Sequence, residues 1–500
     1  MKPKTVKIKN APSRFRHQVP KYRVVRSDAC INCGLCAKVC PYSVHERLEG
    51  HNKMKHPINY KCIGFECEKN EFYCINKCPQ HALSLKPNPM YETLGDFRWT
   101  SDMITATWIM AETGKAPERC DLEYHIGNSG GGFDKLRFKF PENKPKINKN
   151  EISTEIPLNR RNDNRADVKI SIPVYGGGMS FGSVSPATII SKAKTAKAWN
   201  TFTCTGEGGY PEFLCPYDDH VITQVATGLF GVREKTIQRV KIVEFKYAQG
   251  AKPGLGGHLL GEKHTPSIAK MREAVAGTSL FSPFPFHSVY SIEDHKKHVD
   301  WIKEVNPRAL VSVKVSTPND VDMVAVGSYY ADAHIIHIDG GYGGTGAAPD
   351  IAKKNIAMPI EYAIPKVHRF LSDEGARDKI TLIASGGIRN AHDMVKAICL
   401  GADGVVIGTA ELVALECVRC GNCESGRGCA RGIASTDSEL AALFDEDWAA
   451  QRIINLYNAW YGELVEIMQK FGVKDVRELT GRTDLLEHVD YGKNGGEENE

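Results

Sequence analysis

Between Lys169 and Thr409, short runs of β-branched and other apolar residues alternate with longer stretches that have helical spacing. Near-continuous apolar runs of about five residues are typical of parallel strands that are buried on both faces. Runs of this kind, alternating with helices over about 250 residues, predict an α/β protein with a (β/α)₈ TIM barrel; a doubly wound sheet is the alternative. The eight expected strands are Ile170–Tyr175, Thr201–Thr205, His220–Ala226, Val240–Tyr247, Leu310–Ser316, His334–Asp339, Ile380–Ser385 and Gly404–Thr409.

The chain before the barrel has two different patterns. Residues 1–89 are rich in cysteine, are punctuated by proline and predict few regular elements. Residues 90–168 predict a helical and linker region, with a helix over Trp99–Glu112 and a polar linker over Pro141–Asn164. We therefore expect two units ahead of the barrel, the first of them a two-cluster ferredoxin-like domain for the reasons given below.

After the barrel, which is expected to span 169–435, the pattern becomes helical again. Apolar residues recur at three- and four-residue spacing over Trp448–Phe471, which predicts an amphipathic helix. The last residues, GKNGGEENE, predict a disordered acidic tail. Residues 436–500 are thus expected to form a helical C-terminal extension that ends in this tail.

Composition places the chain among ordinary globular proteins. Of its 500 residues, 42% are hydrophobic and 25% charged, and the net charge is only +4, so no nucleic-acid partner is indicated. No apolar run approaches about 18 residues, and Met1–Lys21 lacks the apolar core of a secretory signal. We expect a cytoplasmic protein without a membrane partner.

The sixteen cysteines are clustered along the chain. Eight lie between Cys30 and Cys78 and four between Cys417 and Cys429. Gaps of two and three residues, in a sequence without an export signal, favour metal ligation over disulfides. The other four are expected to be buried apolar residues: Cys120, Cys204, Cys215 and Cys399.

The first cysteines match an iron–sulfur pattern. Cys30 begins a C-x₂-C-x₂-C-x₃-C-P run, which is the bacterial signature of 4Fe–4S clusters, and a second, looser set ends at Cys78 before another proline. In two-cluster ferredoxins the fourth cysteine of a run ligates the other cluster. A zinc site and disulfides are the alternatives. The predicted ligand sets are Cys30, Cys33, Cys36 and Cys78 for one cluster, and Cys62, Cys67, Cys74 and Cys40 for the other.

Glycines follow three of the predicted strands. Gly176–Gly178 follows the first strand, Gly386 and Gly387 follow the seventh, and Gly408 with Thr409 ends the eighth. In TIM barrels, glycine-rich turns after strands 7 and 8 commonly bind phosphate with backbone N–H groups. A glycine platform also lets the backbone approach a flat ring closely. Together these features suggest bound FMN, with a substrate phosphate as the alternative.

One motif points elsewhere. Gly341–Gly346 satisfies the G-x-G-x-x-G pattern of dinucleotide-binding folds, and Glu361 follows at a suitable distance. Ile356–Leu371, however, predicts a helix, which leaves no second strand to carry that acidic residue. A Rossmann fold is therefore not expected, and electrons should arrive singly through the clusters.

Several long, ordered motifs occur in the barrel and after it. They are GGGMSFGSVS (176–185), TGEGGY (205–210), QVATGLFGV (224–232), AQGAKPG (248–254), SPFPFHSVYSIED (282–294), GGTGAAP (343–349), IGTAELVAL (407–415) and ELTGRTDLLE (478–487). On these motifs, residues Lys169 to His488 resemble the FMN-binding domain of glutamate synthase. With a ferredoxin segment in front and no amidotransferase, the chain resembles the short, archaeal-type large subunits of that family.

The resemblance implies an FMN- and iron–sulfur-dependent oxidoreductase that acts on CH–NH₂ groups. In this family, ammonia and 2-oxoglutarate form 2-iminoglutarate, and reduced FMN delivers a hydride to C2 to give L-glutamate. By the same resemblance, Lys252 and Arg272 bind the substrate carboxylates, while Met179, Ser180 and Glu207 line the pocket. A planar guanidinium suits a carboxylate, which it can bind with two parallel hydrogen bonds.

The resemblance also implies the flavin contacts. Lys314 matches a lysine beside the flavin, where a cation stabilises the anionic reduced ring. The expected set is Gly178, Met179, Ser180, Thr205, Gln249, Lys314, Gly344, Gly386, Gly387, Gly408 and Thr409.

A third cluster is implied after the eighth strand. Family members carry three cysteines there, ligating a 3Fe–4S cluster near the flavin, and Cys417, Cys423 and Cys429 match them. This chain adds Cys420, and four thiolates suit a 4Fe–4S cube, so we favour four irons over three. Zinc is a further alternative. The insertion at 417–429 would hold the last cluster before FMN.

Two departures from the family pattern fall in the substrate pocket. Leu255 and His258 stand where long members have glutamate and glutamine, and Gly341 and Tyr342 stand in place of histidine and aspartate. An amine-using enzyme like N-methylglutamate synthase is therefore an alternative function. A subunit that only transfers electrons, with the barrel as a scaffold, is an alternative of another class.

The expected partners follow from what the sequence does not show. It contains no recognisable glutaminase nucleophile at its start and no β-helix domain, so ammonia is expected free or from a separate glutaminase subunit. A β-helix subunit is expected as well. The electron donor is expected to be an NADPH-dependent small subunit or ferredoxin.

Overall fold

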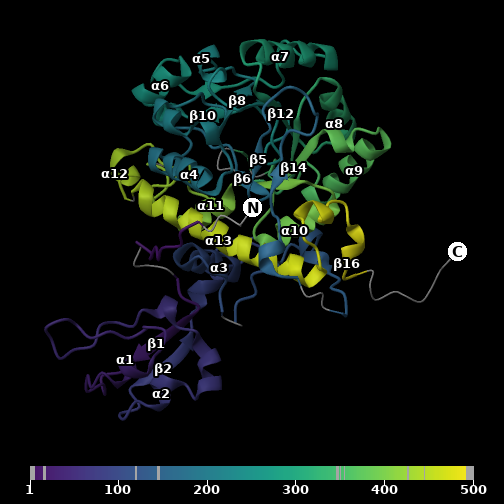
Figure 1. Cartoon of the computed structure of the whole chain (residues 1–500). Helices are drawn as coiled ribbons and strands as arrows, with labels where there is room; N and C mark the ends of the chain where they lie inside the picture. The colour runs from purple at the N-terminus through teal and green to yellow at the C-terminus, as the bar shows by residue number, and fades with distance from the viewer. Residues whose placement is uncertain are drawn as a thin grey trace.

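A computed structural model describes residues 6–14, 19–118, 121–143, 147–344, 348–349, 351–353, 355–424, 427–443 and 445–490. Figure 1 shows a large barrel of strands and helices with the smaller cysteine-rich part below it. Two helices lie between these parts, α3 (Ser101–Thr113) and α13 (Glu446–Phe471). None of the described helices is long and apolar enough to cross a lipid bilayer.

Eight parallel strands form the central sheet, in the spatial order β6-β15-β14-β13-β12-β9-β8-β7. The two end strands also meet: Gly176 N donates to Phe202 O over 2.9 Å, and Thr201 Oγ1 donates to Val174 O over 2.7 Å. The predicted (β/α)₈ barrel is therefore confirmed, and the doubly wound alternative is excluded. The strands are β6 (Val174–Gly176), β7 (Thr203–Cys204), β8 (Val221–Ala226), β9 (Ile242–Lys246), β12 (Leu310–Ser316), β13 (Ile335–Asp339), β14 (Thr381–Ser385) and β15 (Gly404–Ile407).

The predicted first strand is wrong in its first half. Lys169–Ile170 (β5) leaves the barrel and pairs antiparallel with β4 (Ile156–Pro157), and the barrel strand begins only at Val174. Pro173 has no N–H to donate, and its carbonyl accepts from Val405 N over 2.9 Å. The apolar run therefore serves two sheets.

Helices cover the outside of the barrel and follow the strands. They are α4 (Pro186–Trp199), α5 (Glu234–Ile237), α6 (Pro266–Arg272), α7 (Ile292–Val305), α8 (Val321–Tyr330), α9 (Ile360–Asp373), α10 (Ala391–Leu400) and α11 (Thr409–Ala414). The helix predicted from Ile356 is α9, which begins after Pro359, and no strand lies between it and Thr381 among the described residues. Glu361 is thus a helical residue, as expected, and the dinucleotide motif lacks its second strand. Residues 345–347 of that motif lie outside the described residues.

The expected polar linker, Pro141–Asn164, is only partly a linker. Ile152, Ile156 and Leu158 are buried, and the carbonyls of Pro157 and Leu158 accept from Thr381 Oγ1 at the start of β14. These three apolar side chains close the N-terminal end of the barrel. In the sequence they are separated by polar residues, so the stretch does not have an apolar pattern.

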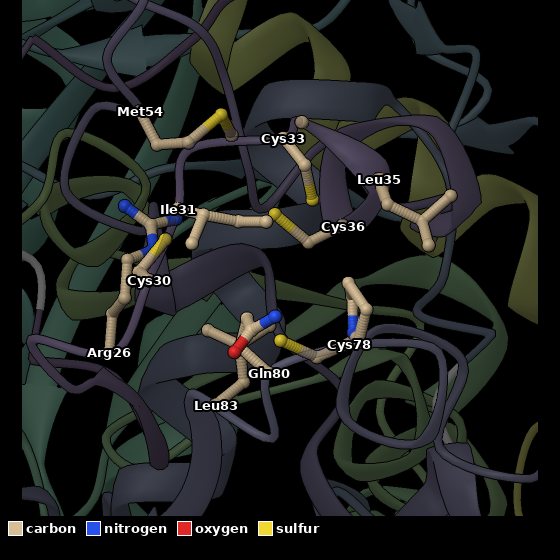
Figure 2. Close-up of a pocket in the computed structure, with 12 residues that line it drawn as sticks. Arg26, Cys30, Ile31, Cys33, Leu35, Cys36, Met54, Cys78, Gln80 and Leu83 are labelled. Atoms are coloured by element: carbon tan, nitrogen blue, oxygen red, sulfur yellow. The ribbon is translucent and has the colours of Figure 1, made fainter.

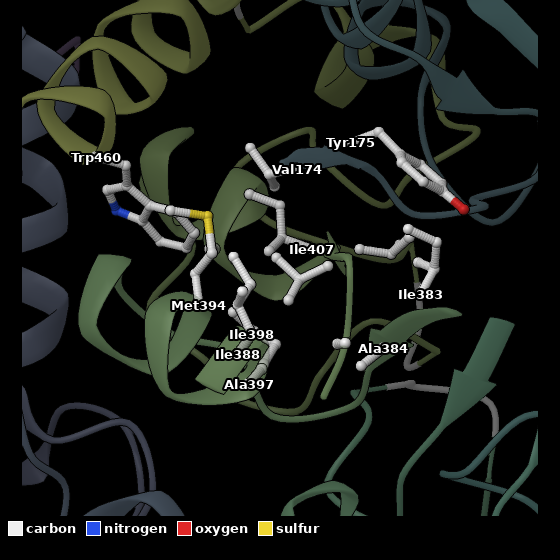
Figure 3. Packing of buried hydrophobic residues seen from close by; sticks show 14 of the residues in the cluster. Val174, Tyr175, Ile383, Ala384, Ile388, Met394, Ala397, Ile398, Ile407 and Trp460 are labelled. Atoms are coloured by element: carbon white, nitrogen blue, oxygen red, sulfur yellow. The ribbon is translucent and has the colours of Figure 1, made fainter. Parts of the chain in front are cut away.

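The two predicted flanking helices are confirmed as α3 and α13. A fully buried arginine of α13, Arg452, donates to the carbonyls of Ala11, Trp108 and Ala414 over 2.7, 3.3 and 2.6 Å. Figure 3 shows the apolar core running from barrel residues such as Ile407, through Met394 of α10, to Trp460 of α13. The N-terminal segment, α3 and α13 are therefore parts of one packed structure with the barrel.

The cysteine-rich part is held by a two-stranded antiparallel sheet, β1 (Tyr22–Arg26) with β2 (Leu83–Pro87). Each cysteine run contains a short helix, α1 (Leu35–Val39) in the first and α2 (Tyr73–Asn76) in the second. This is the repeated plan expected of a two-cluster ferredoxin fold.

The remaining elements are short. They are β3 (Leu136–Phe138) paired with β16 (Leu486–His488), the hairpin of β10 (His258–Leu259) and β11 (Leu280–Phe281), helix α12 (Ser438–Ala441), and the 3₁₀ helices η1 (Asn59–Lys61), η2 (Gly64–Asn70), η3 (Pro89–Thr93), η4 (Gly132–Lys135), η5 (Lys149–Glu151), η6 (Glu212–His220), η7 (Gly261–Lys263), η8 (Arg377–Lys379), η9 (Val476–Leu479) and η10 (Thr483–Leu485). The predicted acidic tail lies outside the described residues.

Candidate functional site

The first predicted ligand set surrounds one pocket. Cys30, Cys33 and Cys36 line it together with Cys78, which comes from the other end of the cysteine-rich part. Figure 2 shows the four sulfur atoms turned toward a common space. The exchange of the fourth cysteine between the two runs, expected from the ferredoxin pattern, agrees with this arrangement.

The second set gathers around Cys74. Burial, and after it the nearby thiols of Cys40, Cys62 and Cys67, raise the pKa of the Cys74 thiol to about 12. Four thiolates in so small a volume repel one another, and a bound cation removes that cost. The donor set therefore fits an iron–sulfur cluster.

The third set lies on the barrel, in the loop after α11. Burial raises the pKa of Cys417 to about 11, with Cys429 and Cys423 contributing, and the Cys420 thiol also raises the pKa of Cys423. The loop is tied to the barrel mouth, because Ile433 O accepts from Ser185 N over 2.9 Å at the start of α4. All four predicted cysteines thus come together here.

The sulfur separations discriminate between metals. A tetrahedral zinc site with Zn–S bonds of about 2.3 Å needs sulfurs about 3.8 Å apart. No three described cysteines bring their sulfur atoms within 4.8 Å of one another. Among the described residues, none of the three sets is therefore arranged as a preformed tetrahedral zinc site.

The segment just before Cys62 is electrostatically coupled to the loop that carries Cys417. Tyr60, in η1 just before Cys62, is half-buried, and its pKa is raised to about 12 by burial and then by Glu112 and Glu416. Glu416 is the neighbour of Cys417 in the chain.

The barrel mouth is a cradle of close backbone approaches. A Cβ on Gly206 (φ +70°) would lie 2.7 Å from Ser180 N, and one on Gly344 would lie 2.6 Å from Thr409 Oγ1. The methyl group of Met179 lies beside Gly408. The turns after β6, β7, β13 and β15 are therefore neighbours, as a bound flavin requires.

Arg98 reaches the turn after β14 from outside the barrel. Its Nη2 lies 3.4 Å from Gly387 O, its guanidinium stacks on Tyr342 at 3.7 Å, and it is 3% exposed. Nη1 has no hydrogen-bond partner among the described residues. A buried guanidinium with a free N–H at this turn fits a phosphate.

A chain of polar side chains crosses the inside of the barrel. Glu244 accepts from Gln224 over 2.6 Å and from Ser312 over 3.0 Å, and it lies 3.1 Å from His337 Nδ1. His337 Nε2 lies 2.7 Å from Ser385 Oγ. Buried polar groups that satisfy one another in this way form a rigid floor under the mouth.

This floor continues to Lys314. Ser385 donates to Asp339 Oδ1 over 2.5 Å, and Asp339 Oδ2 lies 3.7 Å from Lys314 Nζ. Burial would lower the pKa of Lys314, but Asp339 and Glu244 outweigh it and raise the pKa, so the lysine is charged. A fixed cation therefore lies in the barrel where the resemblance expects the flavin.

A second pocket opens at the mouth beside the glycine cradle. It is lined by Ser180, Glu207, His258 and Arg272, with Gly228, Gly257 and others. Arg272 Nη2 donates to Ser180 Oγ and Phe181 O, both over 3.2 Å, while its Nε has no partner among the described residues. The pocket thus holds a buried guanidinium with capacity for an anion.

Glu207 links two lysines at this pocket. It lies 3.0 Å from Lys246 Nζ and 3.9 Å from Lys252 Nζ. Burial alone would raise the pKa of Glu207, but the two lysines lower it to about 2. Lys252, which also donates to Gly256 O over 3.1 Å, has a pKa lowered by burial and partly restored by Glu207.

Two further predicted residues have mainly backbone contacts. Thr205 Oγ1 donates to Gly206 O over 2.9 Å and accepts from Gln224 N, and Gln249 O accepts from Lys252 N over 3.2 Å. Both lie at strand ends that face the mouth.

The residues that differ from the pattern of the long family members lie in different surroundings. His258 lines the pocket and stacks on Phe281, whereas Leu255 is 43% exposed. The ring of Tyr342 stacks on the guanidinium of Arg98.

Of the lone cysteines, Cys204 and Cys399 are buried as predicted and Cys120 lies outside the described residues. Cys215 is exposed, so that prediction is wrong: it lies in η6, whose only buried residue is Leu214.

Comparison with known proteins gives a consistent result. A family model described as the conserved region in glutamate synthase matches residues 132–474, and one described as a 4Fe-4S dicluster domain matches residues 23–79. The archaeal glutamate synthase (NADPH) of Methanocaldococcus jannaschii is 36% identical over 503 residues, which are 94% of this chain and 95% of that protein. The chain belongs to the glutamate synthase family. The predicted family membership is confirmed.

Within the glutamate synthase family, the short members match the whole chain. The archaeal-type glutamate synthase (NADPH) of Thermotoga maritima is 36% identical over 498 residues, covering 94% of this chain and 95% of its own length. The large chain of Azospirillum brasilense glutamate synthase (NADPH) is also 36% identical, but over 63% of this chain and 21% of its own. A solved flavocytochrome b2 variant with sulfite bound covers 73% of this chain and 79% of its own, at 15% identity and a TM-score of 0.45.

Several residues of this glutamate synthase site were missed in the sequence. Glu244, His337 and Asp339 lie inside apolar strand runs, where a lone polar residue is the only signal. Lys246 ends such a run. Arg98 lies in a segment far before the barrel in the sequence, and no local pattern there indicates that its side chain reaches the barrel mouth.

Proposed function

We propose that this chain forms L-glutamate from 2-oxoglutarate and ammonia, using FMN in the barrel mouth and electrons that pass through iron–sulfur clusters. In balance, 2-oxoglutarate, ammonia, two electrons and two protons give glutamate and water. The observation that carries the proposal is the pocket beside the glycine cradle, which Arg272 and Glu207 line, with Lys252 behind Glu207 at 3.9 Å. Family membership supports the same reaction.

The charges of the pocket suit this substrate. 2-Oxoglutarate is a dianion, and Arg272 and Lys252 are buried cations, 5% and 4% exposed, that its two carboxylates would pair. Glu207 stays ionised because Lys246 and Lys252 lower its pKa. We propose that its carboxylate attracts the positively charged nitrogen of ammonium or of the protonated imine. Ser180, which is bonded to Arg272, lines the same pocket, while the predicted Met179 lies at the glycine cradle beside Gly408.

FMN would be held by the predicted glycine turns and Lys314. When bound, it supplies the hydride for carbon 2 of the imine. We propose that its phosphate lies at Gly386, Gly387, Gly408 and Thr409, with Arg98 as a further partner. Lys314 would lie beside the ring, charged and fixed by Asp339, and so favour an anionic ring.

We also propose three clusters. Two 4Fe–4S clusters would use the exchanged ligand sets in the cysteine-rich part. The third would be 4Fe–4S, held by Cys417, Cys420, Cys423 and Cys429. Because the segment just before Cys62 is coupled to Glu416, electrons would enter at the Cys30 set, pass the Cys62 set and leave through the Cys417 set.

The electron donor belongs to the same proposal. An NADPH-dependent small subunit or ferredoxin would dock near the pocket of the first set. Ammonia would come free or from a separate glutaminase subunit, and a β-helix subunit is a further expected partner. The enzyme would work in the cytoplasm.

The test uses anaerobic holoprotein whose flavin has been bleached with a reductant. Addition of 2-oxoglutarate and ammonium should restore the flavin absorbance with formation of L-glutamate. Neither compound alone should do so. If the flavin is reoxidised by 2-oxoglutarate only when methylamine replaces ammonium, the chain is an N-methylglutamate synthase-like enzyme, an outcome to which the changed residue His258 in the pocket would contribute. No response to either would leave an electron-transfer scaffold and refute the proposal.

A further inference from the structure

Outside the barrel, at the start of the helix that follows β14, three possible metal ligands from separate parts of the chain meet. One nitrogen each of His125 and His392 and one carboxylate oxygen of Glu463 lie within 4.8 Å of one another. His125 Nε2 is 3.3 Å from Glu463 Oε1, and the two imidazole rings are 3.7 Å apart between centres. His125 follows α3, His392 is in the first turn of α10, and Glu463 is in the middle of α13.

Two buried polar atoms of this cluster are unsatisfied. Neither His392 Nδ1 nor Glu463 Oε2 has a hydrogen-bond partner among the described residues. Buried polar atoms without partners are rare in native proteins, and the binding of an ion is one of the standard reasons for them. Their presence in the same cluster is an observation independent of the ligand geometry.

Neighbouring bonds fix the ligands in place. Asn390, the N-cap of α10, donates to Tyr124 O over 3.0 Å, and the Tyr124 hydroxyl donates to Glu463 Oε1 over 2.9 Å. Tyr124 adjoins His125 and Asn390 lies two residues before His392. The three ligands are therefore positioned by contacts that do not depend on a metal, which is what a preformed site needs.

The nearby cations are otherwise engaged. Lys396 Nζ donates to Phe133 O over 2.8 Å, and Lys470 pairs with Glu466 at 2.8 Å. Burial, His125 and these two lysines lower the pKa of His392 to about 2, so its ring is neutral, which is the form that binds metals. His125 is 39% exposed, which leaves one side open to a water ligand.

We propose that His125, His392 and Glu463 form a binding site for a divalent transition-metal ion of the Zn²⁺ class, with water as the fourth ligand. Two imidazoles and one carboxylate are a donor set that zinc accepts. The ion would join the segment after α3 to α10 and α13, and none of its ligands is among the residues assigned above to the flavin or the substrate. The site is separate from all twelve cysteines assigned to clusters and does not rest on the proposed reaction.

The test uses anaerobic holoprotein with its full iron content, equilibrated with ZnCl₂ and dialysed. The wild type should retain one zinc per chain, and zinc-edge X-ray absorption should show only N/O neighbours at about 2.0–2.1 Å. His125→Ala and Glu463→Gln should lose this zinc while iron and flavin stay unchanged. Glu466→Gln, which changes an exposed carboxylate one turn along α13, should keep it.

The variants also give a binding constant. Because each removes a direct ligand, the dissociation constant for Zn²⁺ should rise by more than the roughly 10–100-fold that loss of an outer partner causes. Circular dichroism of the zinc-free variants, expected to match the wild type, checks that they are folded. Sulfur neighbours at about 2.3 Å, equal zinc in all variants or no zinc in the wild type would overturn the proposal.

Discussion

The guanidinium of Arg98 lies 3.7 Å from the centre of the Tyr342 ring, at the turn that carries Gly387. Tyr342 stands where long glutamate synthases have a different residue, and it stacks on an arginine contributed by the segment before α3. The changed residue and the arginine thus form one unit at the proposed phosphate site.

Replacement of this arginine should weaken FMN binding. Arg98→Gln removes a charged hydrogen-bond donor, worth about 1.5–3 kcal/mol, so the dissociation constant for FMN should rise by roughly 10–150-fold. Riboflavin, which has no phosphate, should bind equally well to both proteins. Quenching of flavin fluorescence on titration into deflavinated protein measures both constants. Arg308→Gln, an exposed arginine at the other end of the barrel, is the control, and equal losses for FMN and riboflavin would refute the assignment.

Arg272→Lys should separate substrate binding from flavin binding. Lysine keeps the charge but cannot form the two parallel bonds of a guanidinium, so the KM for 2-oxoglutarate should rise by about tenfold or more. Steady-state kinetics at saturating ammonium measures this change, and flavin content should be that of the wild type. Arg233→Lys alters an exposed arginine that pairs with Glu273 at 2.9 Å and should leave the KM unchanged. An unchanged KM in Arg272→Lys would contradict the carboxylate role.

Glu207→Gln should change the pH dependence on the basic side. Burial lowers the pKa of Lys252 and Glu207 raises it, so loss of the carboxylate lets the pKa fall further. Since 2-oxoglutarate needs the charged lysine, kcat/KM should begin to decline at a lower pH than in the wild type. Profiles from neutral to alkaline pH measure the shift, and Glu212→Gln, an exposed carboxylate, is the control. A basic limb at the wild-type position would show that the two groups are not coupled.

Cys420→Ser should convert the third cluster. With three thiolates left, the site suits a 3Fe–4S cluster, so iron per chain should fall by one and an oxidised three-iron signal should appear in electron paramagnetic resonance. The two clusters of the cysteine-rich part should keep their signals. Cys215→Ser, which removes an exposed lone cysteine, should change nothing. An unaltered spectrum in Cys420→Ser would mean that Cys420 is not a ligand.

The sequence predicted the barrel well because buried parallel strands leave long apolar runs. Its error at Ile170 arose because one apolar run supplies two different sheets, which the residues alone do not reveal. The Pro141–Asn164 stretch was misjudged for a related reason: three apolar side chains that close the barrel are outnumbered by polar neighbours.

The candidate site was predictable only where a motif has its own signature. The cysteine spacing and the glycine turns indicated chemistry without any tertiary information. The chain of Glu244, His337 and Asp339 could not be found in this way, because the strands that carry it are distant in sequence and meet only when the barrel closes. Arg98 and the His125 cluster depend on long-range packing as well.

The three carbonyls that Arg452 binds belong to the amino-terminal strap, to α3 and to the end of α11. Lys21, at the start of the cysteine-rich part, pairs with Asp102 of α3 at 3.1 Å, so a hinge toward the barrel would have to break this pair as well as move the strap that the buried Arg452 holds. Electron delivery should therefore behave as tunnelling through a rigid body, with a rate that solvent viscosity does not alter. We therefore do not expect electron transfer by movement of a mobile cluster domain, as occurs where such a domain is joined to its partner by a flexible linker.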